Sequence, residues 1–300
     1  MHNNEYKKGL VSCIIPTYKR NNTLIRAINS VMNQTYSNLE ILVIDDNVPN
    51  DENSLSVQKQ LKAISDNRIR YIQQEKHING AVARNVGINS AKGEFVAFLD
   101  DDDEWKNTKI EKQVEFLNEN PKIGGVSSYY EFFNNDILVR KCYPYNCNEI
   151  HKKIIGRSVA VFTSTVLMRR ISLDKSGYFD ESLKRHQDLQ LLLDFTSVNK
   201  FEVISEYLVC LHIDDEMNRG NSRNIVEIKN MFFEKEKSHF DKYDKHTKRR
   251  LYDAHYFEII FSALKGKRLI LAIKYLCKIG FNIYAYKDVM IRYKERKINL

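Results

Sequence analysis

Residues 94–105, EFVAFLDDDDEW, carry an apolar run straight into four consecutive aspartates. Adjacent like charges repel each other, so a folded chain keeps such a group only where water solvates it or positive charge neutralises it. Closely spaced carboxylates at a strand end suit Mg²⁺ or Mn²⁺, which bind oxygen ligands and share them with substrate phosphates. The alternative is a solvated turn whose acidic residues precede a helix. The pattern of strands and helices around residues 100–103 distinguishes a metal site from a solvated turn.

The surrounding sequence alternates between short apolar runs and segments in which apolar residues recur at helical spacing. Strands are predicted at residues 11–16, 40–45, 69–73 and 94–99. Helices are predicted at 54–64 and at 81–93, the second closed by Gly93. Thr108 and Glu111 fit a capping box for the next helix. This alternation predicts a mostly parallel sheet covered by helices on both faces.

The pattern is looser in the second half of the chain. Short strands are predicted at 124–130, 137–143, 163–168 and 201–209. A helix is predicted at 187–198, and the chain reads as helical and basic from residue 225 onward. We therefore divide it into an α/β domain, residues 1–222, and a basic helical extension, residues 223–300. Residues 212–224, the most loop-like stretch, are the expected flexible lid.

Composition limits the class of protein. The 300 residues are 43% hydrophobic and carry a net charge of +8, which favours acidic or phosphorylated partners. Five cysteines without a CxxC pair are typical of a reducing compartment. We find no apolar signal segment and no spanning run of 18 apolar residues, so a cytoplasmic protein is expected. The patterns of a phosphate loop, a dinucleotide fingerprint, a zinc site and a nucleophile elbow are missing.

Three predicted strands end in polar residues. The first runs into residues 17–20, the second into 45–46 and the fourth into 100–103. Open parallel sheets bind their ligands beyond the carboxyl ends of the strands, at one edge. We therefore expect these side chains to converge on one crevice, and this convergence favours the metal site over the solvated turn.

Three stretches resemble the inverting glycosyltransferases of family 2. They are VSCIIPTYKRNNTLIRAINSVMNQTYSNLEILVIDD (11–46), NGAVARNVGINSAKGEFVAFLDDDDEW (79–105) and, more loosely, GYFDESLKRHQDLQLLLDF (177–195). The resemblance implies a GT-A fold, a Rossmann-like and mostly parallel sheet flanked by helices, with a helical C-terminal extension. It also implies transfer of a hexosyl or N-acetylhexosaminyl group to a hydroxyl of a glycan or lipid-linked acceptor. The products of such enzymes are capsule, O-antigen or lipooligosaccharide.

The resemblance assigns the nucleotide-sugar contacts residue by residue. Tyr18 should lie against the base and Asp46 should contact it, a pair that usually recognises uracil and so implies a UDP-sugar donor. Arg84 should lie near the diphosphate. Residues 45–51, DDNVPND, depart from the commoner Asp-Asp-Gly-Ser pattern. The expected nucleotide-sugar-binding residues are Pro16, Thr17, Tyr18, Arg20, Asp46, Arg84, Asp100 and Asp101.

The same resemblance assigns the metal and the base. Asp102 is the expected ligand of Mn²⁺ or Mg²⁺, and Asp100 or Asp101 supports the metal or contacts the ribose. The order within four identical residues stays open. Asp188 in HQDLQ is the expected catalytic base, which takes the proton of the acceptor hydroxyl as it attacks with inversion. Gln187 stands where the family often has glutamate.

Other interpretations stay open. Residues 265–300 are expected to form helices packed on the catalytic domain, and their basic and apolar stripes also suit contact with an anionic membrane at the inner face of the cell membrane. A basic nucleic-acid-binding protein is the first alternative, although no motif of that class is present and no such partner is expected. A degenerate, non-catalytic nucleotide-sugar-binding scaffold is the second. His212 is a structural histidine, a third metal ligand or a diphosphate contact.

Overall fold

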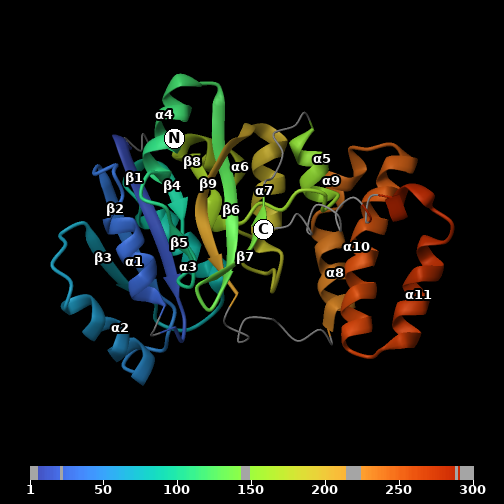
Figure 1. Ribbon diagram of the computed structural model, residues 1–300, viewed down its shortest axis with the longest axis horizontal. Coiled ribbons are helices and arrows are strands. Elements are labelled where there is room, and N and C mark those ends of the chain that lie inside the picture. The colour runs from blue at the N-terminus through green and yellow to red at the C-terminus, as the bar shows by residue number, and fades with distance from the viewer. Residues whose placement is uncertain (1–5, 21–22, 143–148, 214–223, 288–289, 291–300) are drawn as a thin grey trace.

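The computed structural model describes residues 6–20, 23–142, 149–213, 224–287 and 290 (Figure 1). Its strands are β1 (Lys7–Thr17), β2 (Leu39–Asp45), β3 (Ile69–Gln73), β4 (Gly93–Phe98), β5 (Glu104–Trp105), β6 (Ile123–Asn134), β7 (Ile137–Cys142), β8 (Leu167–Arg169) and β9 (Lys200–His212). Its helices are α1 (Leu24–Met32), α2 (Glu52–Lys62), α3 (Gly80–Ser90), α4 (Lys109–Glu119), α5 (Ile150–Ile155), the 3₁₀ turn η1 (Thr163–Thr165), α6 (Arg170–Ser176), α7 (Gln187–Val198), α8 (Ile225–Lys235), α9 (Lys237–Asp241), α10 (Lys245–Lys265) and α11 (Leu269–Ile279).

The strands form one sheet in the order β3-β2-β1-β4-β8-β6-β9-β5, with β7 paired to β6. The first four of these strands are parallel, as the alternation predicts. Beyond β4 the sheet is mixed, because β8 runs antiparallel to both β4 and β6 whereas β6 and β9 are parallel. The carboxyl ends of β1, β2 and β4 therefore share one edge, as expected.

Two apolar cores lie on the two faces of this sheet. Side chains alternate between faces along β1, so Ile14 belongs to one core and Cys13 to the other. Every residue of β2 is buried, because a parallel strand is covered on both faces. Helix α3 approaches β1 closely at Gly87, where an added Cβ would lie 2.4 Å from Cγ2 of Ile14. This close packing fixes the N-terminus of α3 beside the carboxyl edge.

Three local predictions were wrong. The helix expected at 81–93 ends at Ser90, and Gly93 instead opens β4, where a Cβ would lie 2.5 Å from the carbonyl oxygen of Leu10. Thr108 precedes α4 without a side-chain cap, because Glu111 accepts its hydrogen bond from Thr35 Oγ1 at 2.8 Å. The strand expected at 163–168 is largely η1. In that turn the hydroxyl and carbonyl groups of residue 164 bond to the aspartate loop and Trp105.

The C-terminal helices pack in two ways. Phe232 and Phe240 from α8 and α9 belong to the same core as Ile14 of β1, whereas most of α10 and α11 packs in a separate core around Ile259, to which α8 adds Ile225. Figure 1 shows α10 and α11 at the end of the molecule farthest from β3. Among the described residues, no helix combines the length and apolar character needed to cross a membrane. The division at residues 222 and 223 stays a prediction, and most of the expected lid at 212–224 lies outside the described residues.

Candidate active site

A cavity of about 450 Å³ opens at the carboxyl edge of the parallel strands. It is bounded by the ends of β1, β2 and β4, by the start of α3 and by the loop before α3. Every nucleotide-sugar residue expected from the sequence lines it except Arg20, and so does Asp102. The lining residues are Pro16, Thr17, Tyr18, Asp46, His77, Ile78, Asn79, Gly80, Ala83, Arg84, Asp100, Asp101 and Asp102.

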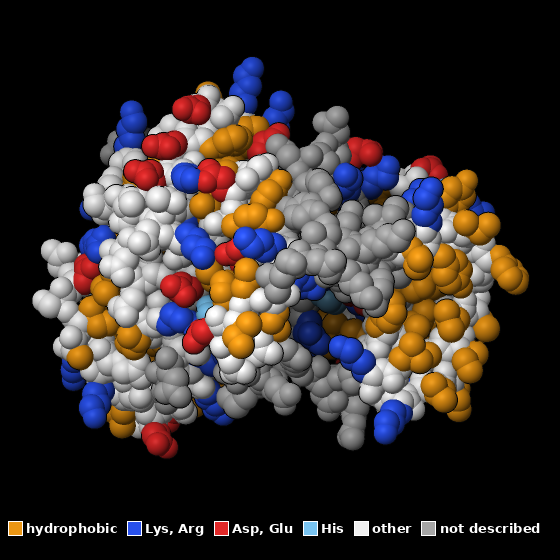
Figure 2. Space-filling view, in the orientation of Figure 1, with side chains coloured by type: hydrophobic (Ala, Val, Ile, Leu, Met, Phe, Trp, Pro, Cys, Tyr) orange, Lys and Arg blue, Asp and Glu red, His pale blue; other side chains and the backbone are white. Residues whose placement is uncertain are grey.

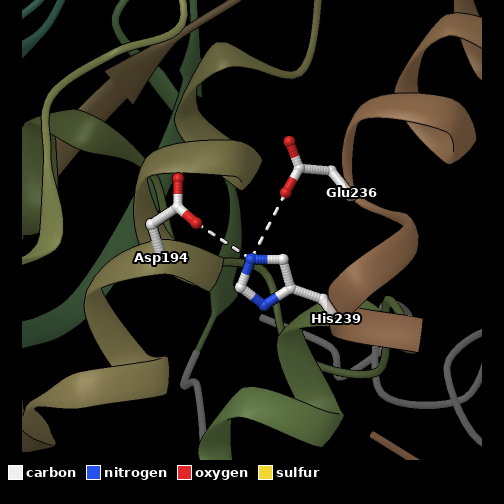
Figure 3. A group of neighbouring side chains, drawn as sticks. All are labelled: Asp194, Glu236 and His239. Atoms are coloured by element: carbon white, nitrogen blue, oxygen red, sulfur yellow. Dashed lines mark hydrogen bonds and ion pairs between the residues drawn. The ribbon is translucent and has the colours of Figure 1, made fainter. Parts of the chain in front are cut away.

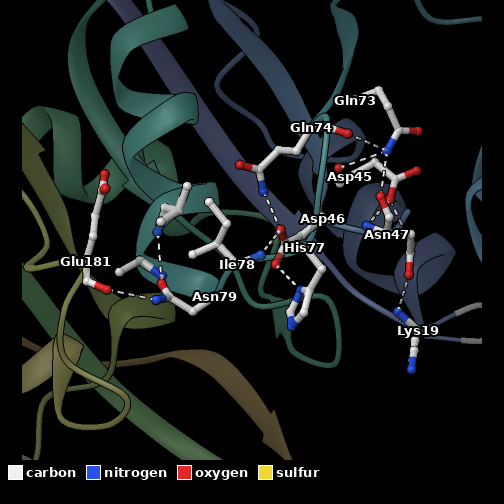
Figure 4. A network of polar contacts seen from close by, with 12 residues as sticks. Lys19, Asp45, Asp46, Asn47, Gln73, Gln74, His77, Ile78, Asn79 and Glu181 are labelled. Carbon is white, nitrogen blue, oxygen red and sulfur yellow. Dashed lines mark hydrogen bonds and ion pairs between the residues drawn. The ribbon is translucent and has the colours of Figure 1, made fainter. Parts of the chain in front are cut away.

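The carboxylate of Asp46 is the centre of a polar network in this cavity (Figure 4). One oxygen accepts hydrogen bonds from Nε2 of Gln74 at 2.5 Å and from the backbone N–H of Ile78 at 3.3 Å. The other lies 2.8 Å from Nδ1 of His77. Burial raises the pKa of Asp46, and the contacts from His77 and Ile78 offset only part of this rise. Asp46 is therefore held in one orientation at the cavity wall.

The ring of His77 also stacks on Tyr18, with the ring centroids 3.7 Å apart and the planes 10° from parallel. Tyr18 directly follows β1, whereas His77 lies in the loop after β3. The stacked pair leaves one outer face on each ring, and an aromatic face of this kind can bind a planar base. The sequence predicted the Tyr18 half of this pair and missed His77.

The loop after β2 depends on Asn47, which takes the position of glycine in the Asp-Asp-Gly-Ser pattern that the resemblance implies. The Oδ1 atom of Asn47 accepts a hydrogen bond from the backbone N–H of Lys19 at 2.9 Å, and its Nδ2 donates to Asp45 at 2.7 Å. Gln73 Nε2 donates to the Asn47 carbonyl at 2.9 Å (Figure 4). The asparagine thus ties the ends of β1, β2 and β3 together.

Two of the four aspartates reach solvent and pair with arginines. Asp100 accepts a hydrogen bond from Nη2 of Arg84 at 2.5 Å, and Asp102 lies 3.0 Å from Nη2 of Arg20. Arg84 comes from α3, whereas Arg20 follows β1. These arginines supply the positive charge that a run of like charges requires.

The other two aspartates are buried. Ser164 donates to Asp103 at 2.6 Å, and the backbone N–H of His212 donates to it at 3.2 Å. Burial raises the pKa of Asp103 well above its usual range, and burial raises that of Asp101 to about 7. The ring of His212 stacks on Phe133, so this histidine supports Asp103 through its backbone.

The aspartate loop suits a hard divalent cation. Carboxylate oxygens of Asp100, Asp102 and Asp103 lie within 4.8 Å of one another. Because Asp103 already accepts two hydrogen bonds, the more exposed Asp100 and Asp102 are the residues able to hold the ion. Asp101 and Thr17 are both buried in the cavity wall, and the contact from the Thr17 hydroxyl opposes the rise that burial causes in the pKa of Asp101.

Asp188 lies in the first turn of α7 and is partly buried. The residue at the N-cap position of α7 is His186, and Asp188 is the second residue of the helix. It is not among the residues that line the cavity. Burial opposes the positive charge of Arg84, but the charges of Asp100 and Asp188 outweigh it and raise the Arg84 pKa. Asp188 is therefore electrostatically coupled to the cavity through Arg84.

A second arginine lies in the field of Asp188. Burial opposes the charge of Arg157, but Glu258 and Asp188 raise its pKa above the usual value. Nε of Arg157 donates to Oε1 of Glu258 at 2.7 Å, and Glu258 belongs to α10. The C-terminal helices thus hold one of the two arginines around Asp188.

Sequence reasoning missed four residues that follow β3: Gln74, His77, Ile78 and Asn79. Asn79 caps α3 by accepting hydrogen bonds from the backbone N–H groups of Ala81 and Val82. The signal was available, because β3 is parallel to β2 and its carboxyl end must lie at the same edge. Residues 74–79 were not predicted to be part of the site, because they include no group of closely spaced carboxylates.

Comparison with known proteins identifies the family. Residues 12–177 match glycosyl transferase family 2. The chain is 34% identical over 210 residues to an uncharacterised glycosyltransferase of Rickettsia felis, covering 69% of this chain but only 34% of that protein. It is 30% identical to the Escherichia coli protein WfgD, a UDP-Glc:alpha-D-GlcNAc-diphosphoundecaprenol beta-1,3-glucosyltransferase, over 73% of this chain and 83% of WfgD.

A solved structure agrees on the fold. The structure of residues 1–349 of Staphylococcus aureus TarS, in complex with UDP-GlcNAc, covers 90% of this chain with a TM-score of 0.66, and the match extends over 80% of the TarS chain. At 19% identity this likeness concerns the fold alone, and it confirms the expected GT-A architecture. The match over residues 12–177, together with the 30% identity to WfgD, shows that the chain belongs to glycosyl transferase family 2.

Proposed function

We propose that this protein is an inverting glycosyltransferase that uses a UDP-sugar donor and a divalent cation. The observation that carries the proposal is the single cavity wall that joins Tyr18 and Asp46 to Arg84, Asp100 and Asp102. The aromatic ring of Tyr18 and the carboxylate of Asp46 suit a nucleobase. The guanidinium of Arg84 suits a diphosphate, and the exposed carboxylates of Asp100 and Asp102 suit a metal ion. Family membership favours this function over the nucleic-acid-binding alternative.

Asp46 and Tyr18 recognise the base in this proposal. A carboxylate has about four lone-pair positions, and the contacts from Gln74, His77 and Ile78 use three of them. The remaining position accepts the N–H of uracil. The base stacks on an outer face of the Tyr18–His77 pair, and Thr17 and Asp101, which line the same cavity, lie toward the ribose.

Asp102 and Asp100 hold Mn²⁺ or Mg²⁺ next to the diphosphate. The ion supplies Lewis-acid stabilisation of the negative charge that builds on the leaving diphosphate. Arg84 turns from Asp100 toward the same oxygens and adds a second positive charge. Arg20 neutralises Asp102 in the free protein, and this ion pair keeps the carboxylate in place before the cation binds.

Asp188 acts as the general base. A sugar hydroxyl is a poor nucleophile, so a carboxylate must take its proton during the attack on the anomeric carbon. The attack comes from the face opposite the diphosphate, which inverts the anomeric centre in one displacement. Asp188 lies in the electrostatic field of two arginines, because it helps to raise the pKa of both Arg84 and Arg157.

The donor sugar is a hexose or an N-acetylhexosamine, and the acceptor is a glycan or a lipid-linked saccharide. The name of WfgD describes a UDP-glucose donor and a lipid-diphosphate acceptor. By analogy we propose that this protein works in the cytoplasm on a lipid-linked precursor of a surface polysaccharide.

A donor screen tests the activity. UDP-glucose, UDP-galactose and their N-acetylated forms are incubated with the protein, Mn²⁺ and a GlcNAc-diphosphoryl lipid, and released UDP is measured. We expect one donor to be consumed in an acceptor-dependent way and the new linkage to have inverted configuration by NMR. Binding of UDP without turnover of any donor, tested also with monosaccharide and glycan acceptors, would identify the chain as the degenerate scaffold instead.

We also propose that α10 and α11 rest on an anionic membrane, where a lipid-linked acceptor would lie. Figure 2 shows hydrophobic side chains gathered over these helices. Ile270 is 87% exposed and Ile283 74%. Exposed lysines such as Lys267 and Lys274 lie among them. Apolar insertion combined with basic charge is the chemistry that attaches a protein to anionic lipid.

Sedimentation with lipid vesicles tests this contact. The wild-type protein should sediment with phosphatidylglycerol vesicles and less with phosphatidylcholine alone. Replacing Ile270 and Ile283 by aspartate should lower the bound fraction at least about tenfold, because each buried isoleucine contributes about 1.5–3 kcal/mol. Ile171→Asp is the control, since Ile171 is 71% exposed but lies on α6. Equal loss in the control, or no binding by the wild type, would refute the contact.

A further inference from the structure

A second group of metal-ligating side chains lies outside the donor cavity (Figure 3). Asp194 comes from α7, Glu236 lies between α8 and α9, and His239 belongs to α9. Nε2 of His239 lies 2.9 Å from Oδ1 of Asp194 and 3.5 Å from Oε2 of Glu236. Figure 3 shows both carboxylates pointing toward the same ring nitrogen. The group thus joins the helix that carries Asp188 to the C-terminal helices.

The spacing of these atoms suits one small metal ion. Two ligand atoms that each lie about 2.1 Å from an ion, at angles between octahedral and tetrahedral, are about 3.0–3.4 Å apart. The observed separations of 2.9 and 3.5 Å bracket this range, and all three ligand atoms lie within 4.8 Å of one another. The two separations that involve His239 are therefore close to those that a shared ion requires.

Glu236 points to a cation more directly. Its side chain is 5% exposed, and its Oε2 atom lies 3.5 Å from Nε2 of His239, which is long for a hydrogen bond. A buried carboxylate is costly unless a charge compensates it. A cation held among the ligand atoms of Asp194, Glu236 and His239 would supply that charge.

The surrounding hydrogen bonds suit metal ligation. Nδ1 of His239 lies 2.9 Å from Nε2 of His151, whose Nδ1 lies 2.9 Å from the hydroxyl of Tyr243. When Nδ1 of His239 carries the proton, this row of hydrogen bonds orients the ring and directs the Nε2 lone pair toward an ion. The outer partners of metal-bound histidines act in the same way. Gln190 donates to Oδ2 of Asp194 at 2.5 Å, which leaves Oδ1 as a single ligand atom.

We propose that Asp194, Glu236 and His239 bind a divalent transition-metal ion of the zinc class, with water as the fourth ligand. Imidazole with carboxylates suits zinc better than magnesium, which takes oxygen ligands. The ion fastens α7 to the C-terminal helices and so helps to hold Asp188 in position. The proposal is independent of the donor site, because the two groups share no residue.

Zinc titration of the full chain tests the proposal. The protein is freed of metal with a chelator, which is then removed, and Zn²⁺ is titrated in competition with a chromophoric chelator without nucleotide. We expect one tight equivalent per chain and a thermal unfolding midpoint that rises by several degrees. His239→Gln and the near-isosteric Asp194→Asn should abolish both effects. His151→Gln should weaken binding about 10- to 100-fold.

Asp102→Ala is the control, because it alters the donor site and should leave the tight zinc equivalent intact. Loss of zinc binding in Asp102→Ala with retention in His239→Gln would overturn the proposal and assign the ion to the aspartate loop. Zinc binding that persists in both variants, or a wild-type protein that binds none, would also overturn it. The three residues would then form a histidine–carboxylate ion pair.

Discussion

Replacing Asp188 by asparagine is expected to lower kcat for sugar transfer roughly 100- to 10,000-fold, the range that a general base contributes. The asparagine keeps the size of the side chain but cannot accept the proton of the acceptor hydroxyl. Asp188 is not in the wall of the donor cavity, so the affinity for UDP should change by no more than about twofold. The loss is measured as acceptor-dependent release of UDP at saturating donor.

Ser197→Ala provides the matched control for this variant. Ser197 is exposed at the far end of the same helix, α7, so its replacement should leave kcat and UDP affinity unchanged. Asp188→Asn that transfers sugar at the wild-type rate would mean that another carboxylate takes the proton. A parallel loss of UDP affinity would mean that Asp188 acts on the donor through Arg84.

The second large effect is expected from Asp102→Ala, which should abolish the dependence of UDP binding on the cation. In the wild-type protein, calorimetric titration of UDP with Mn²⁺ should give at least about tenfold tighter binding than titration with excess chelator. A metal ion that shares oxygens with a diphosphate contributes several kcal/mol, and each ~1.4 kcal/mol is a factor of ten. In Asp102→Ala the two titrations should give the same, weaker affinity.

Asp241→Asn controls for the general effect of removing a carboxylate, since Asp241 pairs with surface lysines of the C-terminal helices. It should bind UDP and Mn²⁺ as the wild type does. Cation-dependent binding that survives in Asp102→Ala would reassign the ligand to Asp100 or Asp101. No UDP binding to folded wild-type protein would call for GDP, CDP and dTDP in the same assay.

The parallel half of the sheet and the contents of its carboxyl edge could be read from the chain. Apolar runs with helical segments between them specify parallel strands, and parallel strands bring their ends to one edge. Tyr18, Asp46 and the aspartate run therefore met in one cavity as expected. These relationships depend on local pattern and on a general rule of topology, so one sequence is enough to find them.

Helix caps and strand ends that depend on hydrogen bonds to residues remote in sequence were predicted less well. Glu111 bonds to Thr35 instead of capping α4, and Ser164 turns toward Asp103 instead of continuing a strand. Local propensity favours a cap or a strand at these positions, but in each a hydrogen bond to a residue distant in sequence forms instead, and the partner of Ser164, Asp103, is buried. The helix and strand ends are therefore the places where prediction from pattern fails.

The sequence by itself determined the class of fold, the edge that carries the site and the family. Only the tertiary structure decided how the four aspartates differ, because Arg20, Arg84, Ser164 and His212 come from separate parts of the chain. It likewise brought His77 against Tyr18 and assembled Asp194 with His239 across 45 positions of sequence. Charge, burial and ligand geometry depend on distances between residues that are remote in sequence, and those distances exist only once the chain has folded.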